Sequence, residues 1–131
     1  MPTFIRFQPQ QWMVHHVTSR CRKGYAFLKP TQEVNTLFLG VLGRAQHKFK
    51  DRILVHNLVV MSNHYHLLLS AHSTDDLSTF MKFLNGNLTR ALNRVWNEEG
   101  TMWSKRYSSH IILDECALER AYTYILSLIH I

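Results

Sequence analysis

Apolar side chains along this chain follow two alternating spacings, one typical of strands and one typical of helices. Stretches rich in β-branched and aromatic residues predict strands over Trp12–Arg20, Arg52–Met61, His64–Ser70 and Tyr107–Leu113. Only Ser62-Asn63 separates the second of these strands from the third. Such a short polar connection is typical of a turn, so we expect those two strands to form a hairpin.

Between these strands, apolar residues recur at steps of three and four, which predicts amphipathic helices. The first carries its apolar stripe over Val34–Phe49, and Thr31 can cap it. The second and clearest begins at Ser73–Asp76, a capping hydroxyl followed by acids, and continues over Leu77–Val95. A last helix begins at Asp114.

The resulting order, β-α-β-β-α-β-α, predicts an α+β fold: a ferredoxin-like βαββαβ antiparallel sheet with an additional C-terminal helix. No repeat and no Pro/Gly/Ser-rich linker divides the sequence, so we expect residues 1–131 to form a single domain. Because this plan hosts many unrelated activities, the function has to be inferred from a site.

The composition narrows the class of protein. With 46% apolar and 18% charged residues the chain is not a disordered one, and its longest apolar run, Ile53–Met61, is too short to span a membrane. The N-terminus lacks the layout of a secretory signal. Cys21 and Cys116 have no metal-type spacing and are expected to be idle thiols in a reducing compartment, so we expect a cytoplasmic protein.

The charge balance favours a polyanionic partner. Fifteen Lys and Arg against nine Asp and Glu leave a net charge of +6 and a pI near 9.6. Nucleic acid is the commonest polyanion, although a basic domain can also carry its excess charge only for solubility.

The most informative residues are His64 and His66, two apart on a predicted strand. This spacing places both imidazoles on one face, a few ångströms apart and parallel, where they can chelate one divalent metal ion. Tyr65 then faces the opposite way, into the core with Leu67 and Leu69. The alternative is a pair of half-exposed strand histidines without a ligand.

The residues around this pair resemble the HUH motif (His, bulky hydrophobic, His) of single-tyrosine transposases, which include REP-associated tyrosine transposases and their insertion-sequence relatives. The family string is close to M-P-N-H-x-H-L-L, and Ser62 stands here where proline is typical. Four further segments resemble the family in the same order, over residues 12 to 126: His16-Val17-Thr18-Ser19-Arg20 (Y-H-V-T-x-R), Asn85-Gly86-Asn87-Leu88-Thr89-Arg90, Met102-Trp103-Ser104-Lys105-Arg106-Tyr107 (W-x-x-R-Y) and Ala121-Tyr122-Thr123-Tyr124-Ile125 (R-Y-I).

The resemblance implies a specific chemistry. A tyrosine hydroxyl attacks a backbone phosphate of single-stranded, hairpin-forming DNA, which leaves a 5′-phosphotyrosine and a free 3′-OH without any nucleotide cofactor. His64, His66 and a third polar ligand hold Mg²⁺ or Mn²⁺, which offsets charge on the phosphate. The resemblance also implies a homodimer, in which the last helix lies near the partner's HUH face.

Three tyrosines are candidates for the nucleophile. Tyr122 and Tyr124 lie about 200° apart around a helix, so only one of them can face the histidines. Tyr124-Ile125 matches the family's Tyr-Ile pair and is our choice, whereas Tyr122 falls on the apolar stripe. Tyr107 is interpreted as structural or DNA-contacting.

The sequence departs from the family after Ile125. The family continues x-x-N-P-V, and the asparagine one turn beyond the tyrosine resembles the third metal ligand. Here that residue is Leu128, which cannot bind a metal ion. The last residues therefore look like a replaced or truncated terminus after about residue 126; the alternative is a lineage variant in which His130 or water is the third ligand.

A mixed set of basic and polar residues is predicted to contact DNA, since Lys and Arg bind phosphates and Asn can read bases. The alternative for each is a solvated surface charge. The set comprises Arg20, Arg22, Lys23, Lys82, Asn85, Arg90, Arg94, Lys105 and Arg106.

Three functions follow from these observations. The first is a metal-dependent DNA strand transferase with a tyrosine nucleophile. The second is a catalytically inactive hairpin-DNA binder of the same fold, in which Leu128 has removed the chemistry. The third, a small-molecule or metal-storage domain, uses only His64 and His66 and leaves the charge unexplained.

Overall fold

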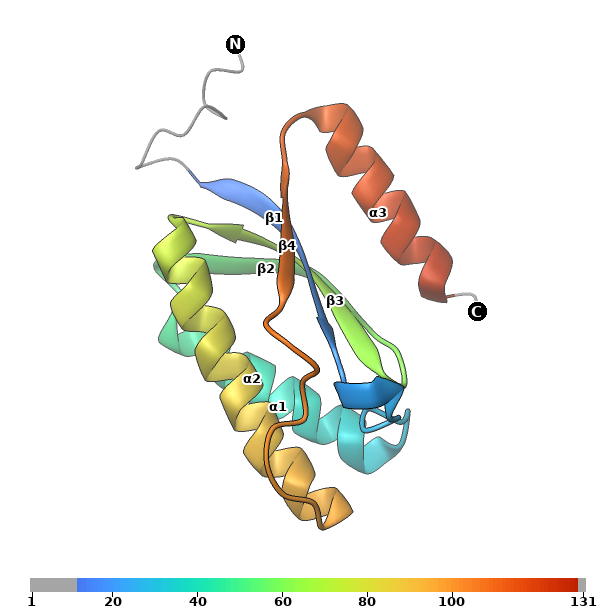
Figure 1. Ribbon diagram of the computed structural model, residues 1–131. Helices are drawn as coiled ribbons and strands as arrows, with labels where there is room; N and C mark the ends of the chain where they lie inside the picture. Colours follow the sequence, from blue (N-terminus) through green and yellow to red (C-terminus); the bar gives the residue numbers. More distant parts are fainter. Residues whose placement is uncertain (1–11, 130–131) are drawn as a thin grey trace.

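The computed structural model describes residues 12–129, with side chains to residue 124, as a four-stranded antiparallel sheet and three α-helices (Figure 1). The strand order is β2-β3-β1-β4, and the predicted α+β fold with its C-terminal helix is confirmed. The elements in chain order are β1 (Met13–Arg20), the 3-10 turn η2 (Arg22–Gly24), α1 (Gln32–Lys48), β2 (Ile53–Val60), β3 (His64–Ala71), α2 (Thr74–Trp96), β4 (Ser108–Ile112) and α3 (Glu115–Ile129).

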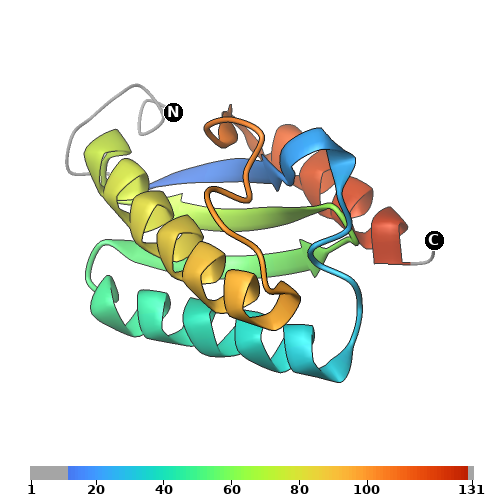
Figure 2. The ribbon, with the colours of Figure 1, turned by 60° about the horizontal axis from the view of Figure 1, so that its bottom comes forward.

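The helices cover both faces of the sheet. Helices α1 and α2 lie side by side on one face, and α3 lies alone across the other (Figures 1 and 2). Both long helices begin where the sequence predicts: Thr31 Oγ1 accepts from the Val34 N–H, and Ser73 Oγ accepts from the Asp76 N–H. These caps satisfy amide groups that would otherwise be unpaired at a helix start.

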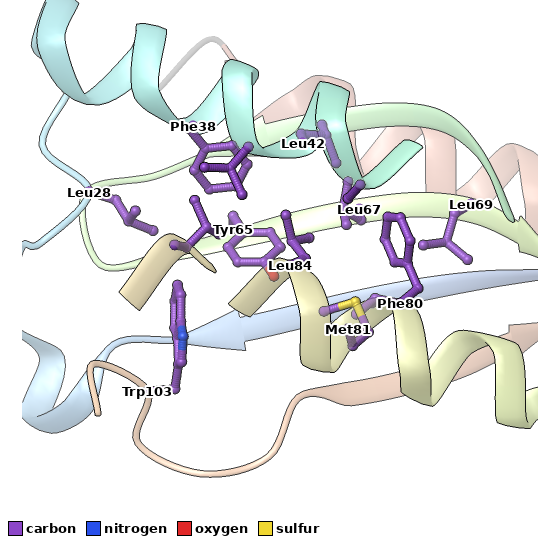
Figure 3. Close-up of a cluster of buried hydrophobic side chains, with 14 of the residues drawn as sticks. Leu28, Phe38, Leu42, Tyr65, Leu67, Leu69, Phe80, Met81, Leu84 and Trp103 are labelled. Carbon is purple, nitrogen blue, oxygen red and sulfur yellow. The ribbon is translucent and has the colours of Figure 1, made fainter. Parts of the chain in front are cut away.

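The main core lies between the sheet and the pair α1 and α2. Figure 3 shows Tyr65, Leu67 and Leu69 of β3 in one buried cluster with Phe38 of α1 and Leu84 of α2. All five side chains are fully buried, with at most 1% of their surface exposed. The predicted inward direction of Tyr65 is therefore confirmed, and the alternate residues of β3 must face α3.

A buried polar network lies within this core. The Tyr65 hydroxyl donates to Asn85 Oδ1, Asn85 Nδ2 donates to Ser19 Oγ at 3.0 Å, and Trp103 Nε1 donates to the Asn85 carbonyl at 3.1 Å. These three hydrogen bonds let Asn85, on α2, connect β1, β3 and the segment before β4. They also satisfy the Tyr65 hydroxyl, which needs a partner because it is buried.

Two further sequence predictions concern membrane-spanning segments and the two cysteines. Within residues 12–129, no helix is long and apolar enough to cross a membrane. Both cysteines are free: Cys21 is buried, which raises the pKa of its thiol to about 11, and Cys116 is exposed.

We expect Asn85→Ala to lower the free energy of unfolding by about 1–3 kcal/mol, because the hydrogen bonds of the Asn85 amide with the Tyr65 and Ser19 hydroxyls are then lost in the core. Urea unfolding followed by circular dichroism measures this change. Asn35→Ala on the exposed side of α1 is the matched control, with the same gain in helix propensity and no buried group left unpaired. Equal stability of the two variants would contradict the structural role of the network.

Candidate functional site

The two predicted histidines share the sheet face that α3 covers. Their ring centroids are 5.1 Å apart, which is close enough for both to reach one ion, as the strand period predicts. The rings are inclined at 78° to each other, so the prediction of parallel imidazoles is wrong. The reason is that Nδ1 of each ring is hydrogen-bonded to a different neighbour, which turns each ring separately.

On His64 the hydrogen bond selects which nitrogen is available. His64 Nδ1 lies 2.7 Å from Asn63 Oδ1. An amide oxygen only accepts, so Nδ1 carries the hydrogen and donates it. Nε2 of the neutral ring is then left with a lone pair, the form that binds metal.

On His66 the same nitrogen faces two partners on the neighbouring strand β1. Its Nδ1 lies 3.0 Å from His16 Nε2 and 3.2 Å from Thr18 Oγ1. Its Nε2 is buried and has no hydrogen-bond partner within the described part of the chain. If Nδ1 donates to His16 or Thr18, Nε2 also has a lone pair. Both imidazoles can therefore offer Nε2 to a shared ion.

The electrostatic surroundings keep these rings neutral near pH 7. Burial, with neighbouring His16, His64 and Arg20, lowers the pKa of His66 to about 4. Burial and the Arg20 charge lower the pKa of His64, and burial with His110 lowers the pKa of His16. Metal binding requires neutral imidazole, so the site is held in the competent form.

A divalent metal ion fits this pair, although the described residues supply only two ligands. The supporting observations are the buried, unpartnered Nε2 of His66 and the hydrogen bond of His64 Nδ1 to Asn63, which leaves the lone pair of His64 on Nε2. Within residues 12–129, no three His, Cys, Asp or Glu side chains are grouped as a metal site. Position 128 lies in α3, but the Leu128 side chain and the whole of His130 are outside the described residues.

Of the three candidate tyrosines, the structure brings Tyr124 to the histidines. Its ring centroid lies 5.6 Å from that of His66 and 6.0 Å from that of His16, and 48% of the residue is exposed. Tyr122 packs against the small cluster between the sheet and α3, as expected for a packing residue. Tyr107 packs against the main core, on the opposite face of the sheet.

The predicted DNA-contacting residues lie in more than one part of the structure. Arg20 is exposed and pairs in register with His64, so it lies at the edge of the histidine face. Arg22 donates to Glu98 at 3.1 Å, and Lys23 occupies a left-handed turn with φ 53°. Both polar atoms of the Asn85 side chain, Oδ1 and Nδ2, are hydrogen-bonded within the core network.

The remaining residues of that set lie on the α2 side. Lys82, Lys105 and Arg106 line one cleft between α2 and the segment that leads into β4. Arg90 donates to Asn87 Oδ1 and lines a neighbouring cleft, while Arg94 is exposed near the end of α2. Contact of any of them with DNA stays a prediction.

Sequence reasoning gave no role to His16 and Thr18, although it placed both in the family's first-strand string. The sequence does contain a sign that the two residues act together. They are two apart on a strand, like His64 and His66, and therefore share one face. What the sequence lacks is the register that pairs Thr18 with His66.

Comparisons with known proteins give a family match and similar folds. The family model described as "Transposase IS200 like" matches residues 10–127. The crystal structure of a "putative transposase" from Deinococcus radiodurans R1 aligns with a TM-score of 0.61 at 20% identity, over 88% of this chain and 90% of that one. The structure of a REP-associated tyrosine transposase bound to a REP hairpin aligns with a TM-score of 0.64 at 16% identity, over 86% of this chain and 64% of that one. At these identities the alignments show the fold alone. No curated protein matches the sequence.

The lowered pKa values predict a pH-dependent stability for the protein in EDTA. The pKa of His66 is about 4 in the folded protein, against the ordinary value of 6.5 in the unfolded chain. Between these pH values the unfolded chain binds more protons than the folded protein, so lowering the pH favours unfolding. We expect the free energy of unfolding to fall as the pH is lowered from about 6.5 to 4. Denaturant titrations across this range measure it.

His66→Gln should reduce this fall by about 1–3 kcal/mol, because one proton-linked group is removed. His47→Gln is the matched control, since His47 is exposed on α1 and away from the sheet face. A pH dependence that is unchanged in His66→Gln would show that His66 is not held neutral by the fold.

Proposed function

The chain belongs to the family of IS200-like transposases, and on that premise we propose that it cuts and rejoins single-stranded DNA through a covalent bond to Tyr124. The observation that carries the proposal is the placement of the Tyr124 ring centroid 5.6 Å from that of His66, next to two histidines that can each offer Nε2 to a metal ion. A nucleophilic hydroxyl and two metal-ligating nitrogens on one sheet face are the groups that phosphotyrosine chemistry requires.

In the proposed reaction the Tyr124 oxygen attacks a DNA phosphorus and the 3′-oxygen of the preceding nucleotide leaves. The phenol gives up its proton, the leaving oxygen takes one up, and the 5′-phosphotyrosine conserves the phosphodiester energy. A free 3′-OH can then reverse the step, so no nucleotide cofactor is needed. Tyr124 is about half exposed, which leaves room for a DNA strand to reach it.

The metal ion would be held by Nε2 of His64 and of His66. Bound there, Mg²⁺ or Mn²⁺ offsets the negative charge that builds on the phosphate. His16 and Thr18 are positioning residues: by binding Nδ1 of His66 they orient the ring and keep Nε2 unprotonated.

The proposed substrate is a DNA hairpin with a single-stranded flank. The basic net charge favours a polyanion, and one structural neighbour was solved with a REP hairpin bound. In this structure Tyr124 lies over the histidines of its own chain. A single copy therefore contains the proposed nucleophile and both metal ligands, and the homodimer stays a prediction, to be measured by light scattering.

The second candidate function is the inactive hairpin-binding protein. The observation that favours it is Leu128, where the family has a polar ligand one turn beyond the tyrosine. Removal of one ligand or of its supporting partner typically costs about 10–100-fold in metal affinity or activity. Hairpin binding should persist in that case, since phosphate contacts elsewhere provide it.

The test is a suicide oligonucleotide that carries a hairpin and single-stranded flank from the DNA next to the gene. We expect a covalent protein–DNA adduct on denaturing gels, which disappears with EDTA, returns with Mn²⁺ and is absent in Tyr124→Phe. Tyr122→Phe is the matched control and should keep the adduct. An adduct that survives in Tyr124→Phe would contradict our choice of nucleophile.

The same assay separates the two candidate functions. If the chain binds the hairpin but gives no adduct, Leu128→Asn should restore one, and Tyr124→Phe in that background should remove it. If neither chain binds hairpin DNA or forms an adduct, the proposed function is wrong.

For the positioning residue we expect His16→Ala to weaken Mn²⁺ binding by about 10–100-fold, because Nδ1 of His66 then lacks a partner that orients the ring. Electron paramagnetic resonance of Mn²⁺ measures this without DNA. His110→Ala is the matched control, since His110 lies opposite His16 on β4 and is exposed. Equal Mn²⁺ affinities of the two variants would contradict the role of His16.

A further inference from the structure

A cleft of about 540 Å³ lies between α2 and the segment that leads from α2 into β4. Helix α2, which forms one wall of the cleft, lies on the side of the sheet opposite to α3 (Figure 1), so the cleft is separate from the histidine face. This volume is within the range of small-ligand sites in proteins. The residues that line it are Ser78, Met81, Lys82, Asn85, Thr101, Trp103, Ser104, Lys105, Arg106 and Tyr107.

The lining combines positive charge with aromatic surface. Lys82, Lys105 and Arg106 are exposed at this cleft, and no acidic residue lines it. Tyr107 is half-buried in the cleft wall, with the Arg106 guanidinium 5.5 Å from its ring centroid. Basic side chains bind phosphates, and aromatic side chains stack on flat rings such as nucleobases. A lining of both kinds therefore suits a ligand that contains both groups.

The walls of the cleft are held in place by hydrogen bonds. Trp103 Nε1 donates to the Asn85 carbonyl at 3.1 Å, and Arg106 Nη2 donates to Ser78 Oγ at 3.4 Å. The Ser104 N–H donates to the Arg20 carbonyl at 2.9 Å. A ligand would therefore enter a largely formed site and would lose little affinity to ordering the protein.

We propose that this cleft binds one unstacked nucleotide of the DNA strand, with its base on Tyr107 and its phosphate at Lys82 and Arg106. The inference rests on the proposed function and adds a nucleotide site remote from the chemistry. The positive charge without a neighbouring acid favours a phosphate, and the adjoining aromatic surface favours a nucleotide over inorganic phosphate.

Arg20 connects the cleft with the histidine face. Its carbonyl is bonded to Ser104 at the cleft, and its Cα pairs in register with that of His64. A DNA strand that leaves the cleft at Ser104 therefore passes the end of β1 at Arg20 before it reaches His64. Binding in the cleft would hold the strand that Tyr124 cuts.

The test is the anisotropy of a fluorescein-labelled, short single-stranded oligothymidylate over a range of salt concentrations. Lys82→Ala/Arg106→Ala should weaken binding about tenfold or more and reduce the salt slope by about 0.7 for each phosphate that the protein no longer neutralises. Arg44→Ala/Lys50→Ala removes the same charge from exposed positions outside the cleft and is the matched control. Equal weakening in the two double variants would overturn the proposal, because charge alone would then explain the binding.

Stacking of the base on Tyr107 is tested separately, by the affinity of Tyr107 variants. Tyr107→Leu should weaken binding about tenfold with the salt slope unchanged, and Tyr107→Phe should retain the affinity, because stacking needs a ring. With 4-thiothymidine in the strand, ultraviolet cross-links should map to residues 101–107. Cross-links confined to other segments would overturn the proposal.

These results are independent of the adduct assay. If Tyr124 forms an adduct while the cleft variants bind like the control, the cleft proposal alone is wrong. If the cleft variants bind more weakly than the control but no adduct forms even with Leu128→Asn, the cleft is supported and the cleavage function fails.

Discussion

The alternation of side chains along β3 is the constraint on which the rest of the structure depends. Tyr65, Leu67 and Leu69 are fully buried against α1 and α2, so His64 and His66 have to point to the other face. A shift of register by one residue would turn the histidines toward α1 and α2 and move the core residues to the face of α3. The same apolar contacts that stabilise the fold therefore hold the site in place.

The two faces of the sheet have different roles: one holds the main core and the other holds the residues of the proposed site. The face toward α1 and α2 contains the main core and the Asn85 network. Among the described side chains, the face toward α3 has a small apolar cluster and leaves the histidines beside a half-exposed Tyr124. The proposed chemistry therefore uses a face of the sheet that is separate from the main core.

Placing His66 there has a cost in stability. Its buried Nε2 lacks a partner within the described residues, and burying a polar group unpaired costs about 1–3 kcal/mol. The pairing of its Nδ1 with His16 and Thr18 offsets part of the cost of burying the ring. The remaining nitrogen, Nε2, is left without a protein partner among the described residues, and this is the atom that the proposed metal site would use.

The sequence by itself determined the elements and the direction of the central side chains, because helix and strand periods are local properties. It also placed His64 and His66 on one face and separated Tyr124 from Tyr122, since both inferences need only the geometry of one strand or one helix. Contact with DNA could not be settled in this way, because it depends on how elements meet.

Only the tertiary structure decided which distant residues meet. The β1–β3 register brings Thr18 opposite His66 and His16 within 3.0 Å of it, which turns the two imidazoles apart. Packing directs Asn85 into the core, and the segment before β4 returns along α2 to place Arg106 beside Lys82 in one cleft. No local period carries this information, because such contacts depend on register and packing between segments tens of residues apart.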